Sequence, residues 1–155
     1  MRAVVTVGML LTFAGCGGVG NQTEAPVDPA AVRISGGTSF GMCAGYCVTE
    51  LRLDSLSLTL VETSWRTDLP ERTRTIPLER SAWEHLQALV DTAAFRRLEG
   101  VHGCPDCADG GAEWVEIETA EAAGPVRVTF EYGAALDGIE ELQAAIRELR
   151  DRFER

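Results

Sequence analysis

The stretch of sequence that decides the fold is His102-Gly103-Cys104-Pro105-Asp106-Cys107-Ala108-Asp109-Gly110-Gly111, taken together with the upstream segment Phe40-Gly41-Met42-Cys43-Ala44-Gly45-Tyr46-Cys47. These two segments contain four of the five cysteines, and each lies where a predicted strand begins. Whatever joins the cysteines therefore sets how the two halves of the chain meet.

The chain opens with a pattern typical of a bacterial lipoprotein signal peptide. Met1-Arg2 is a short charged start, residues 3–13 are apolar or small, and residues 12–16 (Thr-Phe-Ala-Gly-Cys) read as a lipobox. In such signals the cysteine is diacylated and becomes the first mature residue, so Cys16 is the predicted lipid attachment site. The apolar run is too short for a permanent membrane helix, which needs about 20 residues. We therefore expect a protein of the bacterial cell envelope, outside the cytoplasm and held at the membrane by its lipid.

The boundaries that follow are a signal peptide over residues 1–15, a tether over residues 16–31 and one folded domain over residues 32–155. The tether is rich in Gly, Pro and polar residues and has almost no large apolar side chain with which to order itself. The whole chain carries 24 acidic and 14 basic residues, a net charge of −10. Nucleic acid is excluded as a partner, because binding phosphates requires clustered basic residues.

The predicted elements run in the order strands, helix, two strands, helix. Strand-like stretches cover residues 32–35, 46–54, 56–63, 72–78, 114–119 and 126–132, and Gly36-Gly37 is expected to end the first. Helices are expected over residues 81–98, from a Ser81–Glu84 capping box, and over residues 137–153. The stripe of the second helix is Ile139, Leu142, Ile146, Leu149 and Phe153. This order predicts an α+β fold, a two-layer sandwich of an antiparallel sheet of about five to six strands with two helices on one face.

The first cysteine segment resembles the signature of a family of small, uncharacterised bacterial envelope proteins, Cys-Phe-Gly-x-Cys-Pro-x-Tyr. The matching residues are Phe40, Gly41, Cys43 and Tyr46, whereas Ser39 and Ala44 replace the family's first cysteine and its proline. The family's layout of strands, helix, hairpin and closing helix covers nearly the whole mature domain. The resemblance implies an envelope protein with a domain of unknown function and brings no known activity.

Structural disulfides are the favoured interpretation of Cys43, Cys47, Cys104 and Cys107, because an exported domain meets an oxidising environment. Three pairings are possible. Each local bond would contribute about 2 kcal/mol by chain entropy, and a bond between the segments about 4 kcal/mol. The family signature pairs Cys43 with the position that Ser39 occupies here. We therefore expect at least one bond between the two segments.

Other chemistries of these segments stay open. The four cysteines, with His102 as a substitute ligand, have spacings acceptable for tetrahedral zinc. The motif over residues 104–107 has the spacing of thiol–disulfide oxidoreductases, although Asp106 and Asp109 disfavour a thiolate. Asp106, Asp109 and Glu113 could collect calcium.

The sequence names no substrate and no reaction. Trp114 alternates with apolar residues and so is expected to point away from the core, where it would form a possible binding surface with Asp106 and Asp109. The prediction is a non-enzymatic binding or interaction module without a cofactor, which recognises an unidentified protein or small molecule. The alternative is a zinc-binding or thiol–disulfide-active envelope protein that uses the four cysteines.

Overall fold

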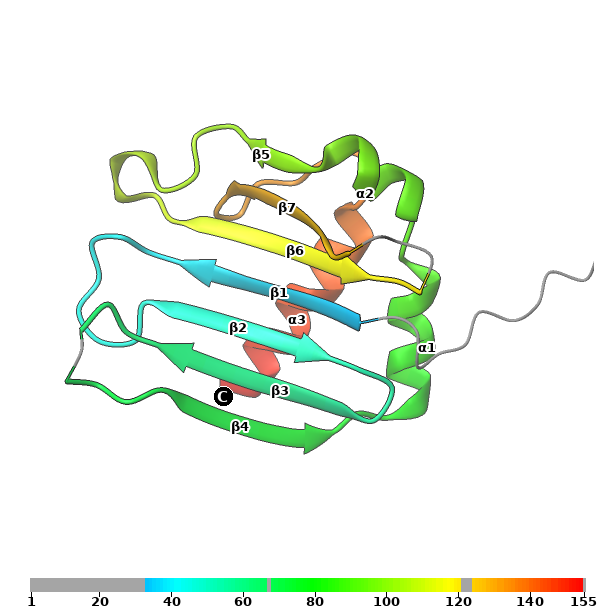
Figure 1. Ribbon diagram of the computed structural model, residues 1–155, viewed down its shortest axis with the longest axis horizontal. Helices are drawn as coiled ribbons and strands as arrows, with labels where there is room; N and C mark the ends of the chain where they lie inside the picture. Colours follow the sequence, from blue (N-terminus) through cyan, green and yellow to red (C-terminus); the bar gives the residue numbers. More distant parts are fainter. Residues whose placement is uncertain (1–32, 67, 121–123, 155) are drawn as a thin grey trace, which may run out of the picture.

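The computed structural model describes residues 33–66, 68–120 and 124–154. These form a sheet with three helices, drawn in Figure 1. The strands are β1 (Arg33–Ser39), β2 (Val48–Leu53), β3 (Ser57–Thr63), β4 (Arg72–Pro77), β5 (Gly100–His102), β6 (Ala112–Glu118) and β7 (Val126–Glu131). The helices are α1 (Arg80–Ala88), α2 (Thr92–Leu98) and α3 (Glu140–Glu154), and η2 (Cys107–Asp109) is one 3₁₀ turn. The predicted signal peptide, Cys16 and the tether lie outside the described residues.

The sheet has seven strands in the order β4-β3-β2-β1-β6-β7-β5. The α+β class is confirmed, but the predicted strand number and the wholly antiparallel pairing are wrong, because β5 pairs parallel to β7. This strand has only three residues, too few to show an alternating pattern. Its place at the edge follows from α2, which ends at Leu98 immediately before it and packs beside β7.

Gly36-Gly37 does not end the first strand, contrary to the prediction, because β1 continues to Ser39 in the middle of the sheet. Neither glycine makes a turn. Both leave room for large side chains to come close to the backbone of β1. A Cβ atom on Gly36 would lie 2.8 Å from the side chain of Ile146 in α3, and one on Gly37 would collide with the ring of Trp114 on the other face. The glycines therefore let α3 and Trp114 pack directly on the backbone of β1.

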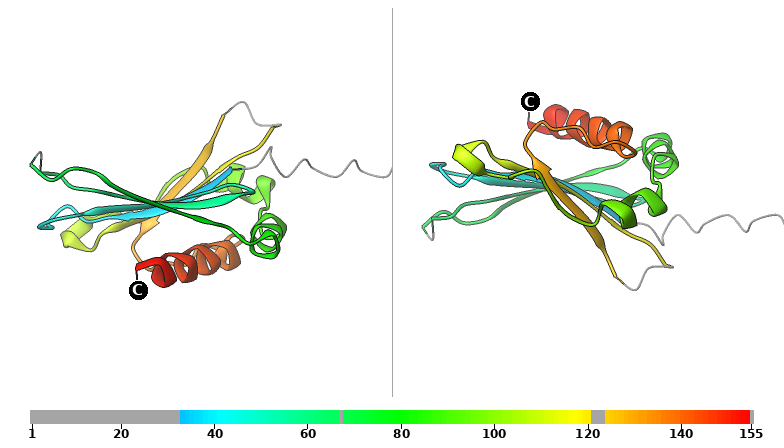
Figure 2. Two further views of the ribbon diagram at one scale, coloured as in Figure 1. Left: turned by 90° about the horizontal axis from the view of Figure 1, so that it is seen from below. Right: turned by 90° about the horizontal axis from the view of Figure 1, so that it is seen from above.

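All three helices lie on one face of the sheet, and no helix of the described residues covers the other, as Figure 2 shows. The predicted first helix is in fact two. The chain leaves α1 after Ala88, and the Asp91 side chain accepts a hydrogen bond of 2.9 Å from the Ala94 amide to cap α2. The Ser81 capping box is also wrong, because α1 begins at Arg80 and places Ser81 inside its first turn.

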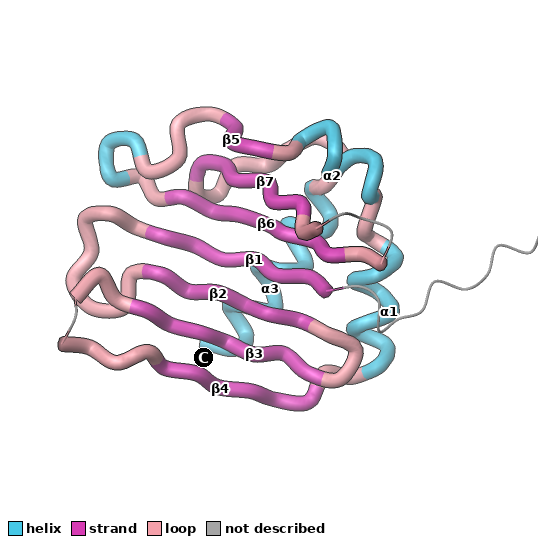
Figure 3. Tube along the Cα trace, in the orientation of Figure 1, coloured by secondary structure: helices cyan, strands magenta, loops and turns pink. Residues whose placement is uncertain are grey.

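The core lies between the sheet and the helices, and the predicted stripe of α3 faces it. Four of the five stripe residues are buried there, and Leu149 packs against them. The hairpin of β6 and β7 is confirmed by their antiparallel pairing, although residues 121–123 of its turn lie outside the described residues. None of the helices described is long and apolar enough to cross a membrane. The connections gather at the two ends of the strands, as the tube of Figure 3 shows.

Candidate functional site

The two cysteine segments lie side by side at one end of the sheet. Ser39, the last residue of β1, pairs with Val48 at the start of β2 and with Ala112 at the start of β6. The segment of residues 40–47 therefore leaves the sheet beside the segment that leads into β6 (Figure 1). We call this region the disulfide end; it comprises residues 40–47 and 103–111 with Trp65 and Tyr132.

Each segment is closed by its own disulfide. Cys43 is bonded to Cys47, with Cα atoms 5.6 Å apart, and Cys104 is bonded to Cys107, with Cα atoms 5.5 Å apart. The expectation of disulfides is met, but the expected bond between the segments is wrong. The larger stabilisation expected for a bond between the segments comes from the entropy of the unfolded chain alone. In the folded chain the backbone pairing of β1 with β6 already fastens the two segments together, and each segment brings its own two cysteines within bonding range.

Hydrogen bonds and packing connect the segments in place of a disulfide. The Gly41 amide donates to Oδ1 of Asp106 at 3.1 Å. The Phe40 ring packs edge-on against Tyr132, with centroids 5.1 Å apart, and lies directly over the Gly111 backbone. Gly111 has a φ of +84°, and a side chain there would collide with the Phe40 ring. A glycine is thus required at this position on two counts.

Three large side chains are exposed at the disulfide end: Met42 at 79%, Trp65 at 58% and Tyr132 at 49%. Phe40 connects two of them, because its carbonyl accepts a 2.9 Å hydrogen bond from Trp65 Nε1 and its ring contacts Tyr132. Met42 lies two residues further along the same segment. Trp65 and Tyr132 are therefore held in place by the fold while remaining open to solvent.

A shallow hollow of about 160 Å³ opens beside Phe40 and Tyr132. Tyr46 is fixed at its edge, because its hydroxyl donates to the Pro70 carbonyl at 2.9 Å and the Arg72 guanidinium lies 4.0 Å from its ring centroid. The lining mixes aromatic rings, threonine hydroxyls and two charged groups from α3: Thr38, Phe40, Tyr46, Cys47, Thr49, Tyr132, Arg150 and Asp151. Phe40 and Tyr46 are two of the residues on which the predicted resemblance to the envelope family rests.

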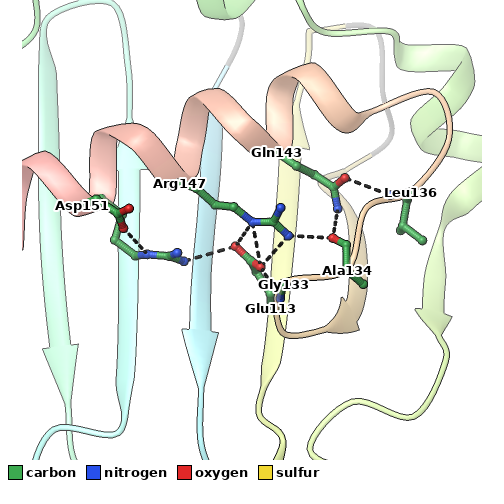
Figure 4. Close-up of polar contacts among 8 residues, drawn as sticks. Glu113, Gly133, Ala134, Leu136, Gln143, Arg147 and Asp151 are labelled. Carbon is green, nitrogen blue, oxygen red and sulfur yellow. Dashed lines mark hydrogen bonds and ion pairs between the residues drawn. The ribbon is translucent and has the colours of Figure 1, made fainter.

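Behind the hollow, a buried carboxylate fastens α3 to the sheet (Figure 4). Glu113 of β6 is 3% exposed and accepts from Arg147 Nη2 at 2.8 Å, from Arg150 Nη1 at 3.2 Å and from the Gly133 amide at 3.2 Å. Arg147 also donates to the Ala134 carbonyl at 2.6 Å. The two arginines neutralise the carboxylate and satisfy its oxygens, as a buried charge requires.

The same network orders the connection between β7 and α3. The Gln143 side chain accepts from the Leu136 amide at 3.0 Å and donates to the Ala134 carbonyl at 3.4 Å. Arg147 also donates to the Ala134 carbonyl, so this loop carbonyl accepts hydrogen bonds from two residues of α3 (Figure 4). Glu113, Arg147 and Gln143 therefore set the position of α3 behind the hollow, which is a structural role.

The structure does not assemble the alternative metal sites. Within the described ranges, no three side chains of His, Cys, Asp or Glu come together as ligands. His102 instead places Nε2 2.6 Å from the Leu98 carbonyl at the end of α2. Asp106 is bound to the Gly41 amide, and Glu113 belongs to the arginine network. The zinc set of four cysteines with His102 and the calcium set with Asp109 are therefore not formed.

Trp114 is not an exposed binding residue. It points to the face opposite the core, as its alternation predicts, but only 8% of it is exposed. The ring lies across Gly37 and under the Arg127 guanidinium, which is 4.9 Å from the ring centroid. Because a glycine lies beneath the ring and an arginine lies over it, the binding surface expected from the sequence is not formed at Trp114.

Sequence reasoning missed the buried ion pairs of Glu113 with Arg147 and Arg150, which hold α3 behind the hollow. A signal was available, since Glu113 has the same strand parity as Val115 and Ile117 and so faces the core. Arg147 and Arg150 lie three residues apart on the helix, beside the apolar stripe. An acidic residue on the core face of a strand predicts a basic partner. The helix that packs on that face, α3, is the expected source of this partner.

No model of a known protein family matches the chain, and a comparison with curated proteins found no match. The resemblance of residues 40–46 to the envelope family therefore stays a prediction. What the chain does has to be argued from the geometry of the disulfide end.

Proposed function

We propose that the chain is a lipid-anchored protein of the bacterial cell envelope whose folded domain is a non-enzymatic binding module. The disulfide end is its recognition surface. The observation that carries this proposal is the group of exposed Met42, Trp65 and Tyr132, of which Trp65 and Tyr132 are fixed by contacts with Phe40. Exposed aromatic and Met side chains are enriched in the cores of protein interfaces, and fixing them in advance lowers the entropic cost of binding.

The direction of β1 supports this assignment. The described domain begins at Arg33, and β1 runs from there to Ser39 at the disulfide end. Seven residues of strand span about 20 Å. A chain arriving from a lipidated Cys16 would enter the sheet at the Arg33 end, so the tether would join the domain at the far end of β1 from the disulfide end. A partner in the envelope could then reach it.

A site-specific photo-crosslinking experiment in intact cells tests the proposal. Leu56 is the matched control for Met42, because the two are exposed to 78% and 79% and Leu56 lies at the opposite end of the sheet, beside Asp54 and the end of β2. A benzophenone amino acid at position 42 should give a discrete crosslinked product that position 56 does not give. Trp65→Ser in the same chain should weaken the product while the unfolding midpoint stays unchanged, because Trp65 is exposed.

Two outcomes would contradict the proposal. One is equal crosslinking from positions 42 and 56. The other is a product from position 42 that persists unchanged in the Trp65→Ser chain.

A further inference from the structure

The two disulfides differ in their access to solvent. Cys104 and Cys107 are both exposed, whereas Cys43 is half-buried and Cys47 is only 3% exposed. The Cys47 amide donates to the Thr63 carbonyl at 2.9 Å, and its own carbonyl accepts from the Phe40 amide at 3.0 Å. The first disulfide is thus fastened into the sheet, while the second lies on an exposed loop. Thiol–disulfide exchange requires direct access of a thiolate to a sulfur atom. Both cysteines of the second bond are exposed, whereas the first bond offers only the half-buried Cys43, so attack on the second bond is favoured.

The backbone of the second loop also favours opening. Asp106, Ala108 and Asp109 have φ angles of 60°, 52° and 61°, in the left-handed region that non-glycine residues rarely adopt. Aspartate tolerates this conformation, but Ala108 has no polar side chain to compensate for it. When Cys104–Cys107 is broken, the loop is free to leave the left-handed conformation. Removing the strain of one such residue shifts the equilibrium toward the reduced, open loop by roughly tenfold.

We propose that Cys104–Cys107 is a thiol–disulfide exchange site that a dithiol reduces while Cys43–Cys47 stays oxidised. A thiolate of the dithiol attacks the sulfur of one of the two exposed cysteines, forming a mixed disulfide and releasing the other cysteine as a thiolate, which takes a proton from water. The second thiol of the reagent, as thiolate, then attacks the mixed disulfide. The reagent leaves as a disulfide, and two electrons and two protons have passed to the two cysteines.

The site accepts electrons and is not built to catalyse exchange in other proteins. Catalytic cysteines of this spacing lie at the N-terminus of a helix, which lowers the thiol pKa. Here only the single turn η2 follows, and Ala108 inside it is not helical. Asp106 and Asp109 add negative charge that disfavours a thiolate. The reduced cysteines should therefore be mostly protonated thiols, which react slowly, and the site is a substrate for a dithiol.

Reduction should also alter the disulfide end. The loop is connected to the first segment through Asp106, which accepts from the Gly41 amide at 3.1 Å. It is held to β7 through the Cys104 amide, which donates to the Glu131 carboxylate at 2.8 Å. Once the loop can move, Asp106 no longer has a fixed position opposite Gly41. The contact between the two segments then weakens, although Cys43–Cys47 remains closed.

Graded reduction of the full chain under native conditions tests the selectivity, with dithiothreitol as the dithiol. After alkylation, trypsin separates the two bonds, since residues 34–52 contain Cys43 and Cys47 and residues 98–127 contain Cys104 and Cys107. Alkylation of the second peptide should be at least about tenfold faster than that of the first. Equal rates, or faster alkylation of the first peptide, would overturn the proposal.

Hydrogen exchange tests the coupling. After selective reduction, the Gly41 amide should exchange faster, whereas the Phe40 amide, which donates to Cys47 inside the intact first loop, should keep its rate. The double variant Cys104→Ser/Cys107→Ser should show the same pattern without any reductant. An unchanged Gly41 rate in both would refute the coupling. Neither measurement requires a binding partner, so failure here is distinguishable from failure of the proposed binding role.

Discussion

Replacing Glu113 by glutamine should destabilise the domain strongly, although the side chain keeps its shape. The carboxylate accepts from Arg147 at 2.8 Å and from Arg150 at 3.2 Å, and it is almost completely buried. Glutamine removes the negative charge and presents an NH₂ group to donors. Arg147 retains its hydrogen bond to the Ala134 carbonyl. Arg150, 7% exposed, keeps only Asp151, at 3.8 Å, among the residues that the structure describes.

Removing one partner of a buried ion pair costs about 3–5 kcal/mol, because the remaining charge is left without compensation. For a domain of this size the melting temperature should fall by about 10–20 °C. The assay is urea unfolding with the disulfides intact, followed by the fluorescence of the chain's tryptophans, of which Trp83 is 2% exposed in the folded domain.

The matched control is Glu116→Gln on the same strand. Glu116 pairs with Arg127 at 3.1 Å, but both side chains are substantially exposed, so the loss should stay within about 1 kcal/mol. Adding Arg150→Met to Glu113→Gln should recover part of the lost stability, since it removes the unpaired buried charge. The reasoning is refuted if the Glu113 and Glu116 substitutions shift the urea midpoint equally. It is also refuted if adding Arg150→Met to Glu113→Gln lowers the midpoint further.

Three further predictions concern the core, the anchor and the response to pH. Leu142→Ala, at a residue that is 0% exposed, should cost about 2–5 kcal/mol in urea unfolding, whereas Leu56→Ala at an exposed position should stay within about 0.5 kcal/mol; similar midpoints would show that α3 is peripheral. Cys16→Ser should release the protein from washed membranes and remove the mass of the acyl chains, and retention with an unchanged mass would exclude the lipid anchor. Partial burial would by itself raise the pKa of Asp54, but the amides of Leu56 and Ser57, at 2.8 and 2.7 Å, hold the net pKa of Asp54 below its ordinary value. Because the folded pKa is the lower one, this carboxylate stabilises the fold above the unfolded pKa of about 3.9, and the effect is lost as the pH falls through the folded value. Asp54→Asn should therefore lower the urea midpoint at about pH 6 and change it little at about pH 2, and an equal loss at both would contradict the role given to the charge.

The alternating patterns of the sequence predicted most of the sheet, and the stripe of α3 predicted the helix that covers it. Alternation also placed Trp114 on the face opposite the core. It could not show that Gly37 leaves room for the ring and that Arg127 covers it, because both contacts come from neighbouring strands. The same limit applies to Gly36, which favours a turn locally but lies under Ile146 of a distant helix.

The candidate site was predictable in its position and not in its bonding. The sequence identified the two cysteine segments as the place where the halves of the chain meet, and the pairing of Ser39 with Ala112 brings them together. Spacing alone could not choose among three disulfide pairings. It also gave no sign that Phe40, through Trp65 and Tyr132, would organise the exposed side chains.

The most direct test of the account is peptide mapping without reduction. The central claim is that each cysteine segment is closed by its own disulfide and that the two meet only through packing and hydrogen bonds. After free thiols are blocked at acidic pH, trypsin should release residues 34–52 and residues 98–127 as two separate peptides, each lighter than its reduced form by two hydrogen atoms. A single species with the combined mass of both peptides, separable only by reduction, would show a bond between the segments and contradict the account.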